Sequence, residues 1–355
     1  MNIKKIISSL ICCTVIIMSA FSSFYAKAAY NCDYIYNRLS AEEAEFYDAL
    51  LEACTSVDEN DRTYEYTPNA KYSSELTEER VGEISLIFYL DHPEFFWISL
   101  ETKYSKIFGS TYFSYKILPS FRNGSTRQKA KSDIKAAAQV YLNGASKYSN
   151  DFERAKYLQD ELLENVSYKI NDWDQSIASV FLLGYTVCAG YSKAYEYLCN
   201  SMGIDSIVIT SCSHAWNAVR IGGHWYLVDV TNDGSSDKFF LISDQRMSEI
   251  DETLNERYRV TGTLNGVETT KTVLLHDIDI FSYIEHYDDF PKCAYTFGDA
   301  NGDDQRTVSD AAYIARMLAS GKRSELDFRA DFNLDNKIDV CDAAAIARVL
   351  AKRKK

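Results

Sequence analysis

The chain contains little proline and little histidine, four and five residues respectively among 355. No proline-rich or serine-rich linker therefore separates the segments described below. Basic residues are also in deficit, 38 against 51 acidic ones, which gives a formal net charge of −13. Apart from the four C-terminal residues 352–355, no basic cluster interrupts this acidity. We therefore expect neither nucleic acid nor an anionic membrane as a partner, and cations are the better candidates.

Long hydrophobic runs are missing after the first residues. Two lysines precede an apolar run over residues 6–21, and Ala26-Lys27-Ala28 has the small residues of a signal-peptidase site. The run is shorter than the ~20 residues that a membrane span needs. The sequence therefore predicts a signal peptide over residues 1–28, no span in the mature protein and a secreted, extracellular location, with a retained anchor as the alternative. Loss of its three lysines would take the net charge from −13 to −16.

Cysteine is too sparse for a disulfide scaffold. Of nine cysteines, two lie within the N-terminal apolar run, and the remaining seven match no disulfide framework of a small secreted domain. Seven is an odd number, so at least one thiol of an exported chain stays unpaired or bonds to another chain. We interpret one of them as a free thiol with a chemical role.

Residues 29–145 are predicted as a lead-in region of mixed helix and strand. Ser40 and Glu43 form a capping box at the start of its first helix. The next elements expected along the chain are strand and core at 87–90 and 95–97, a strand at 111–118, and helices at 126–144 and 151–166.

Residues 146–295 have the order of an α+β domain, a helix followed by several strands. The helix begins near Cys188 and runs to about Met202, where Gly203 supplies the C-terminal cap. Short β-branched runs follow at 207–210, 215–221, 225–230 and 239–242. Residues 244–297 have a weaker pattern, and we expect them to form the finishing edge of the same domain.

A glycine pair predicts the register of two of these strands. Gly222-Gly223 is a two-residue hairpin loop that closes Ile221 against His224. Counted outward from that pair, Asp229 is the diagonal neighbour of His214 on the same face, about 7–8 Å away at Cα. A slip of one residue would put the two side chains on opposite faces. We therefore expect an imidazole and a carboxylate side by side.

Cys188 is the candidate nucleophile. At a helix start, the free N–H groups and the helix dipole favour thiolate over thiol, and the same N–H groups could form an oxyanion hole. In the predicted chemistry Cys188 attacks an acyl carbon, His214 takes its proton and passes it to the leaving amine, and Asp229 orients the imidazole. No cofactor is needed for these steps. A folded site without activity is the alternative.

The motifs that carry these residues resemble the transglutaminase-like superfamily. They are Val187-Cys188-Ala189-Gly190-Tyr191-Ser192, Ser213-His214-Ala215-Trp216-Asn217 and Trp225-Tyr226-Leu227-Val228-Asp229-Val230-Thr231, flanked by Asn165-Val166-Ser167-Tyr168 and Met202-Gly203-Ile204. The resemblance implies a papain-like catalytic domain with Cys188 as nucleophile, His214 as base and Asp229 as the orienting carboxylate. Thr186 and Asn232 depart from the family pattern, and we expect both to reshape the acyl pocket without touching the triad.

The reaction is less determined than the site. Amide hydrolysis and transfer to an amine share an acyl-enzyme and differ in the second nucleophile, and a groove that excludes water would favour transfer. We expect hydrolysis of a peptide or protein substrate. A protein-crosslinking transglutaminase and a non-catalytic module that binds a peptide or glycan are the alternatives.

Residues 298–352 contain an internal repeat. Asp299-Ala300-Asn301-Gly302-Asp303 recurs 32 residues later as Asp331-Phe332-Asn333-Leu334-Asp335, and each copy leads into Asp-Ala-Ala and a predicted helix. Oxygen side chains at alternating positions, with a carboxylate at position 12, suit calcium. The predicted ligands of two Ca²⁺ ions are Asp299, Asn301, Asp303, Gln305, Thr307 and Asp310, and Asp331, Asn333, Asp335, Lys337, Asp339 and Asp342, where Gln305 and Lys337 use main-chain carbonyls.

The repeat resembles a type I dockerin, a module that binds cohesin domains on the scaffoldins of cellulosomes. That resemblance implies a small all-α domain and a cohesin partner. It places Val308, Ser309, Val340 and Cys341 on the face toward cohesin. Asp304 stands at a usual glycine position and Arg306 at a usual apolar position, which implies weaker calcium binding by the first loop.

Overall fold

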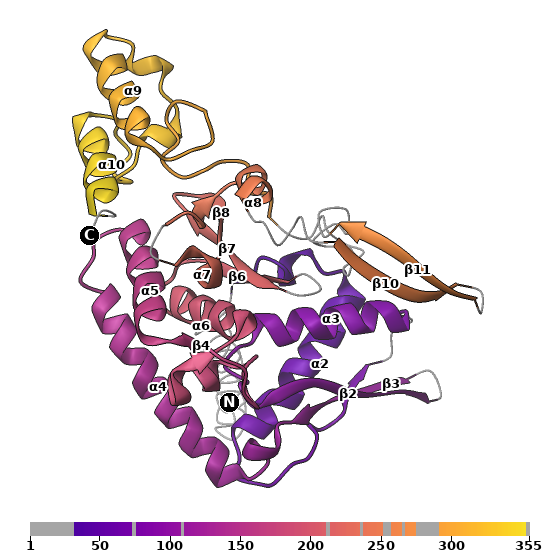
Figure 1. Ribbon diagram of the computed structural model, residues 1–355. Helices are drawn as coiled ribbons and strands as arrows, with labels where there is room; N and C mark the ends of the chain where they lie inside the picture. The colour runs from indigo at the N-terminus through magenta and orange to yellow at the C-terminus, as the bar shows by residue number, and fades with distance from the viewer. Residues whose placement is uncertain are drawn as a thin grey trace, which may run out of the picture.

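The computed structural model describes residues 32–72, 76–107, 110–210, 214–234, 237–250, 257–264, 267–274 and 291–352. The predicted signal peptide lies outside the described residues. Helices and strands are mixed throughout, as expected (Figure 1). None of the described helices combines the length and the hydrophobicity of a membrane-crossing segment.

The lead-in region packs two helices against a small sheet. Helix α2 (Ala41–Asp58) begins at the predicted capping box, in which Ser40 and Glu43 exchange side-chain-to-backbone hydrogen bonds. Strands β1 (Ala70–Tyr72), β2 (Ile98–Ile107) and β3 (Ser110–Ile117) form a sheet in the order β1-β3-β2. Strand β3 confirms the strand predicted at 111–118.

Two strand predictions for this region are wrong. Residues 95–97 are buried core, as expected, but they lie in the turn before β2 rather than in a strand. Residues 87–90 were expected as strand but lie in helix α3 (Glu78–Asp91). The helix is buried on nearly every side, so its apolar residues follow one another without the 3.6-residue period that identifies a helix in sequence.

Helices α4 (Gly124–Ala145) and α5 (Asp151–Asn165) lead from this region to the second one. The guanidinium of Arg127 is fully buried and fixes α4 to the chain before it. It donates hydrogen bonds to the carbonyls of Val57, Asn60, Arg62, Phe121 and Arg122. Since a buried charge is tolerated only when it is hydrogen-bonded, these bonds fix the start of α4 within the lead-in region.

The second region places helix α6 (Cys188–Ser201) on an antiparallel sheet (Figure 1). The sheet order is β6-β7-β8-β9, with β6 at Ser206–Thr210, β7 at Ala215–Ile221, β8 at His224–Val228 and β9 at Phe240–Ile242. The predicted register is confirmed, because Ile221 pairs with His224 and Asn217 with Val228. The remaining elements are β4 (Ser167–Tyr168), β5 (Tyr185–Thr186), a π-helical turn (Ser179–Leu183), α7 (Val230–Asp233) and α8 (Asp244–Ile250).

The segment after β9 differs from the expectation. Strands β10 (Arg257–Leu264) and β11 (Val267–Leu274) pair with each other rather than with the four-stranded sheet, so they do not form its finishing edge. Figure 1 shows this hairpin extending to one side.

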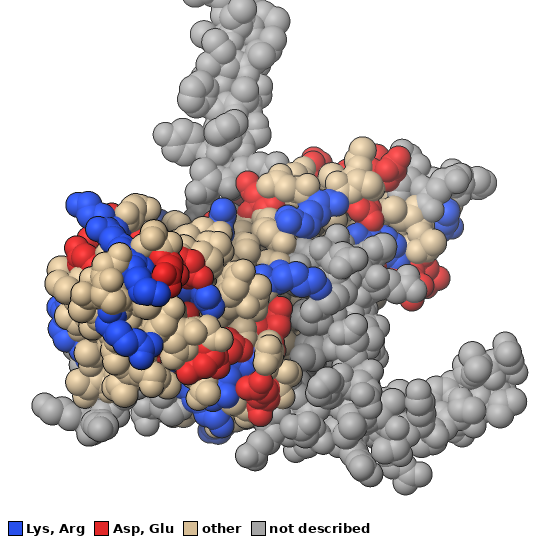
Figure 2. Space-filling model, turned by 90° about the horizontal axis from the view of Figure 1, so that it is seen from above, with Lys and Arg blue, Asp and Glu red and all other residues tan. Residues whose placement is uncertain are grey.

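The C-terminal helical pair consists of α9 (Val308–Ala319) and α10 (Val340–Lys352), which pack on each other. Short 3₁₀ turns at Arg323–Glu325 and Phe328–Ala330 connect them. In Figure 1 the pair lies beside α5 and β8. On the face seen from above, basic and acidic residues are interspersed rather than gathered by sign (Figure 2).

Candidate active site

Cys188 is the first residue of α6. Val187, the N-cap residue, makes no side-chain hydrogen bond to the helix, so no cap side chain occupies the N–H groups of the first turn. Gly190 lets this turn lie close to the preceding strand, because a Cβ there would come within 1.9 Å of Thr186 Oγ1 and 2.7 Å of the Asp174 carbonyl. The unpaired sulfur of Cys188 is partly exposed and lies at the positive end of the helix.

His214 lies between this cysteine and a buried carboxylate. Its Nε2 is 2.7 Å from Oδ2 of Asp229, which is fully buried. The imidazole also hydrogen-bonds the Cys188 side chain, and because Nε2 faces Asp229, Nδ1 is the nitrogen left for the sulfur. The structure thus brings all three predicted residues together in one row.

Pairing outweighs burial at both titrating groups of this row. Burial alone would raise the pKa of the Cys188 thiol, but the hydrogen bond and charge of His214, with the backbone N–H groups of Ala215 and Ala189, lower it below its ordinary value. Burial alone would lower the pKa of His214, but the hydrogen bonds to Asp229 and Cys188 raise it from 6.5 to about 10. Both shifts favour the charged pair, a thiolate beside an imidazolium.

The other described cysteines have the opposite tendency. Burial raises the pKa of the thiols of Cys32, Cys54, Cys199 and Cys293. The hydrogen bond to Asp339 raises the pKa of Cys341. All six described cysteines are unpaired, and Cys212 lies outside the described residues. Among the described cysteines, Cys188 alone has a lowered pKa.

Asn217, in the motif that contains His214, joins strand β7 to helix α6. Its buried Nδ2 donates to the Ser192 carbonyl of α6 at 3.0 Å and to the Ile207 carbonyl of β6 at 3.4 Å. The buried ring of Trp216 stacks near that of His214, with 5.8 Å between their centroids. These contacts explain why the motif contains these two side chains.

The expectation that Asn232 would not touch the triad is wrong. Its Nδ2 donates to Asp229 Oδ2 at 2.9 Å and lies 3.3 Å from His214 Nε2, and its backbone N–H donates to Asp229 Oδ1 at 3.1 Å. The cause is helix α7, which begins directly after Asp229 and turns the chain back over the carboxylate. Thr186, the other departure, instead bonds the Asp174 carbonyl at 2.8 Å.

Tyr168 is a site residue that the sequence argument missed. Strand β4 runs parallel to β5 and pairs Tyr168 with Thr186, two residues before the nucleophile. The phenol hydrogen-bonds both the Cys188 side chain and the Cys188 backbone N–H, and burial followed by the charge of Cys188 raises the pKa of Tyr168. The quoted Asn165–Tyr168 motif contained this residue, but only the strand pairing reveals its role.

Two described histidines outside the row have other partners. The ring of His224, which caps the hairpin, stacks on Phe328 with 3.8 Å between centroids, and His92 pairs with Glu94 at 2.7 Å. His276 and His286 lie outside the described residues. Neither His92 nor His224 forms a second hydrogen-bonded arrangement of cysteine, histidine and carboxylate.

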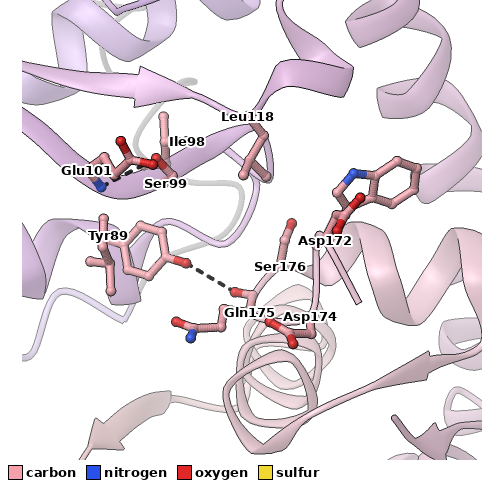
Figure 3. Close-up of a pocket in the computed structure, with 11 residues that line it drawn as sticks. Tyr89, Ile98, Ser99, Glu101, Leu118, Asp172, Asp174, Gln175 and Ser176 are labelled. Atoms are coloured by element: carbon pink, nitrogen blue, oxygen red, sulfur yellow. Dashed lines mark hydrogen bonds between the residues drawn. The ribbon is translucent and has the colours of Figure 1, made fainter. Parts of the chain in front are cut away.

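A cavity of about 360 Å³ lies between the lead-in sheet and the loop before β5 (Figure 3). Tyr89 closes one side by donating to the Gln175 carbonyl at 3.2 Å. The loop is tied to the nucleophile's strand, because the Asp174 carbonyl accepts from Thr186 Oγ1 and from the Val187 N–H. Its lining residues are Tyr89, Ile98, Ser99, Leu100, Glu101, Leu118, Asp172, Trp173, Asp174, Gln175 and Ser176, so the cavity does not contain the cysteine, histidine and aspartate row.

The two predicted calcium loops share one backbone arrangement. Asp299 accepts from the N–H groups of Asp303 and Asp304, and Asp331 accepts from those of the equivalent Asp335 and Asn336. The carboxylates at position 12 of the two loops also accept equivalent hydrogen bonds. Asp310 accepts from the N–H groups of Asn301 and Thr307, and Asp342 accepts from those of Asn333 and Asp339.

The first loop gathers oxygen ligands more closely than the second. Carboxylate oxygens of Asp299, Asp303 and Asp310 all lie within 4.8 Å of one another, which no other trio of acidic, histidine or cysteine side chains does among the described residues. This donor set is entirely oxygen and fits a hard divalent cation.

Comparison with known proteins finds the family that the motifs around Cys188, His214 and Asp229 resemble. The family model of the transglutaminase-like superfamily matches residues 129–230. No curated protein matches the sequence.

Three solved structures have limited similarity to the chain. A TGase is 14% identical over 38% of this chain and 44% of its own, with a TM-score of 0.28. A proposed cysteine protease from Cytophaga hutchinsonii is 14% identical over 37% and 62%, with a TM-score of 0.25. A proposed protease from Parabacteroides distasonis is 12% identical over 36% and 35%, with a TM-score of 0.23. The chain spans less than two thirds of each, so the family match is the informative result: residues 129–230, which begin within α4, are similar to the transglutaminase-like superfamily.

Proposed function

We propose that the protein is a cysteine-dependent acyl-transfer enzyme that hydrolyses an amide or peptide bond through an acyl-enzyme on Cys188. The observation that carries this proposal is the hydrogen-bonded row of Cys188, His214 and Asp229. A row that only supported the fold would have no need for a lowered thiol pKa at a partly exposed helix end.

The first half-reaction uses the ion pair directly. The Cys188 thiolate attacks the acyl carbon, and the protonated His214 gives its proton to the leaving amine. Asp229 accepts the hydrogen bond from Nε2 and keeps the ring oriented toward the sulfur. Asn232 holds that carboxylate through two hydrogen bonds and thereby acts as a positioning residue.

The tetrahedral oxyanion needs hydrogen-bond donors that are already in place. The backbone N–H of Cys188, at the start of α6, is one donor once the substrate oxygen replaces the Tyr168 hydroxyl as its acceptor. The Tyr168 hydroxyl, which lies against that N–H and the sulfur, is the second. Tyr168 is 60% exposed, so water reaches this side of the acyl-enzyme and favours hydrolysis over transfer to an amine.

We further propose that the C-terminal pair is a calcium-dependent dockerin that attaches an exported enzyme to a cohesin-bearing scaffoldin. Asp299 and Asp310 are buried, and burial raises the pKa of both carboxyls. Arg329 pairs with one oxygen of Asp299 at 3.3 Å, and a divalent cation would stabilise the negative form of both carboxyls further. Bound calcium would neutralise these carboxylates and order the loops. Val308 and Val340, at the helix starts, are 68% and 66% exposed and leave an apolar face for a partner.

The reaction class is tested by the products that the enzyme makes. We expect a mixture of unfolded proteins treated with the enzyme to acquire new N- and C-termini, read by mass spectrometry, and Cys188→Ala to abolish them. New isopeptide links in place of new termini would identify a transglutaminase. Identical spectra for both proteins would leave only a binding role.

The ion pair predicts the pH dependence of Cys188 alkylation. Because the folded pKa of Cys188 is lowered, iodoacetamide should label this residue at a lower pH than it labels a thiol with the ordinary pKa of ~8.5. In His214→Ala the labelling should require a pH near that ordinary value. Turnover should fall as the pH rises through about 10, where His214 loses the proton that the leaving amine needs. Labelling of Cys188 and of exposed Cys341 with the same pH dependence would contradict the ion pair, because the pKa of Cys341 is raised.

Tyr168→Phe removes the second oxyanion donor. We expect kcat/KM to fall about 100-fold, while the pH profile of Cys188 alkylation changes little, because the thiolate depends on His214. Tyr185→Phe on the paired strand is the matched control and should keep its activity. A Tyr168→Phe enzyme with unchanged kcat/KM would remove this residue from the reaction.

Calcium removal should unfold the C-terminal pair in part. A chelator is expected to reduce the helical circular dichroism signal, and added calcium should restore it, since the loop carboxylates repel one another without a cation. Asp303→Asn should weaken this response at the first loop, which gathers its ligands most closely. A signal unchanged by chelation would argue against cation-dependent folding.

A further inference from the structure

The first calcium loop departs from its expected pattern at two positions, and both departures contact the catalytic domain. Asp304 occupies the usual glycine position with a φ of 59°. Its two carboxylate oxygens accept hydrogen bonds from Ser243 Oγ at 2.5 Å and from Thr296 Oγ1 at 2.7 Å. A glycine would have the required backbone freedom but could not make these contacts.

Arg306 occupies the usual apolar position. Its buried guanidinium donates to the Phe297 carbonyl at 3.2 Å and to the Phe240 carbonyl of β9 at 3.1 Å. The second loop has Ile338 at this position, which carries no such donor. An arginine that spans two buried carbonyls is a specific connection between the loop and β9.

Aromatic packing extends this interface. Phe152 of α5 lies 5.0 Å from Phe297 and 4.9 Å from Phe332, measured between ring centroids, and all three rings are buried. The second loop joins through Leu334, which packs against the Gly222 turn of the β7–β8 hairpin. The helical pair thus packs directly against the catalytic domain and is not connected to it by the chain alone.

The interface lies one strand from the triad. Strand β9 pairs with β8, and the Phe239 carbonyl, next to the Phe240 carbonyl that Arg306 binds, accepts the backbone N–H of Asp229 at 2.9 Å. Asp229 in turn holds His214. The backbone that Arg306 contacts is therefore the backbone that positions the orienting carboxylate.

We infer that the first loop is a cation-dependent clamp on the catalytic domain, in which Asp304 and Arg306 couple cation binding to the order of β9 and of Asp229. This inference rests on the proposed calcium sites. The carboxylates of Asp299, Asp303 and Asp310 converge on the proposed cation site, whereas the intervening Asp304 and Arg306 contact the catalytic domain. A cation that orders the loop fixes both side chains, and by reciprocity the docked interface strengthens cation binding.

Hydrogen exchange tests the clamp on the full chain carrying Cys188→Ala. With calcium chloride, we expect amide exchange in peptides covering residues 225–242 to slow about tenfold relative to chelator. Arg306→Ile, which copies the residue of the second loop, should abolish this protection while calorimetry shows that calcium still binds. Asp304→Gly, which restores the usual loop residue, should behave in the same way and guards against a folding defect in the first variant.

Each outcome separates the clamp from the calcium sites. Calcium binding without any change in exchange of residues 225–242 would overturn the clamp and leave the sites standing. Protection in Arg306→Ile and Asp304→Gly equal to that of the parent would also overturn it. Absence of calcium binding to the parent chain would overturn the sites and the clamp together.

Discussion

The register of the β7–β8 hairpin is the constraint on which the site depends. Gly222 and Gly223 have φ values of 59° and 86°, which this tight turn requires and other residues rarely adopt. The turn sets the register of every residue pair between β7 and β8, so His214 and Asp229 lie on the same face. A slip of one residue would turn the imidazole away and leave a buried carboxylate without its partner, a loss of about 3–5 kcal/mol.

The choice of nucleophile depends on neighbours rather than on exposure alone. Burial acts on Cys188 as it acts on Cys54 or Cys199, and in those two it raises the pKa because no cation lies beside them. At Cys188 the imidazolium and the backbone N–H groups of Ala215 and Ala189 reverse the result. The same contacts raise the pKa of His214, so each partner stabilises the charged form of the other.

Features that depend on neighbours along the chain could be predicted, and features that depend on distant packing could not. The capping box at Ser40, the start of α6 and the hairpin register follow from local rules, and the structure confirms them. The helical state of 87–90 depends on burial from all sides, which a sequence pattern does not contain. The roles of Tyr168 and Asn232 arise from a parallel strand pair and from a four-residue helix, neither of which has a sequence signal.

The first of the two proposed calcium loops illustrates how one short segment can have two partners. In such a loop the cation ligands alternate with other residues, so side chains at positions 6 and 8 are available for contacts outside the loop. Asp304 and Arg306 use these positions to bind Ser243, Thr296 and the carbonyl of Phe240. Judged only by the ligand pattern, Asp304 and Arg306 are departures that would weaken a cation site. In the folded chain they are interface residues, and the departure from the pattern is what joins the module to the sheet that carries Asp229.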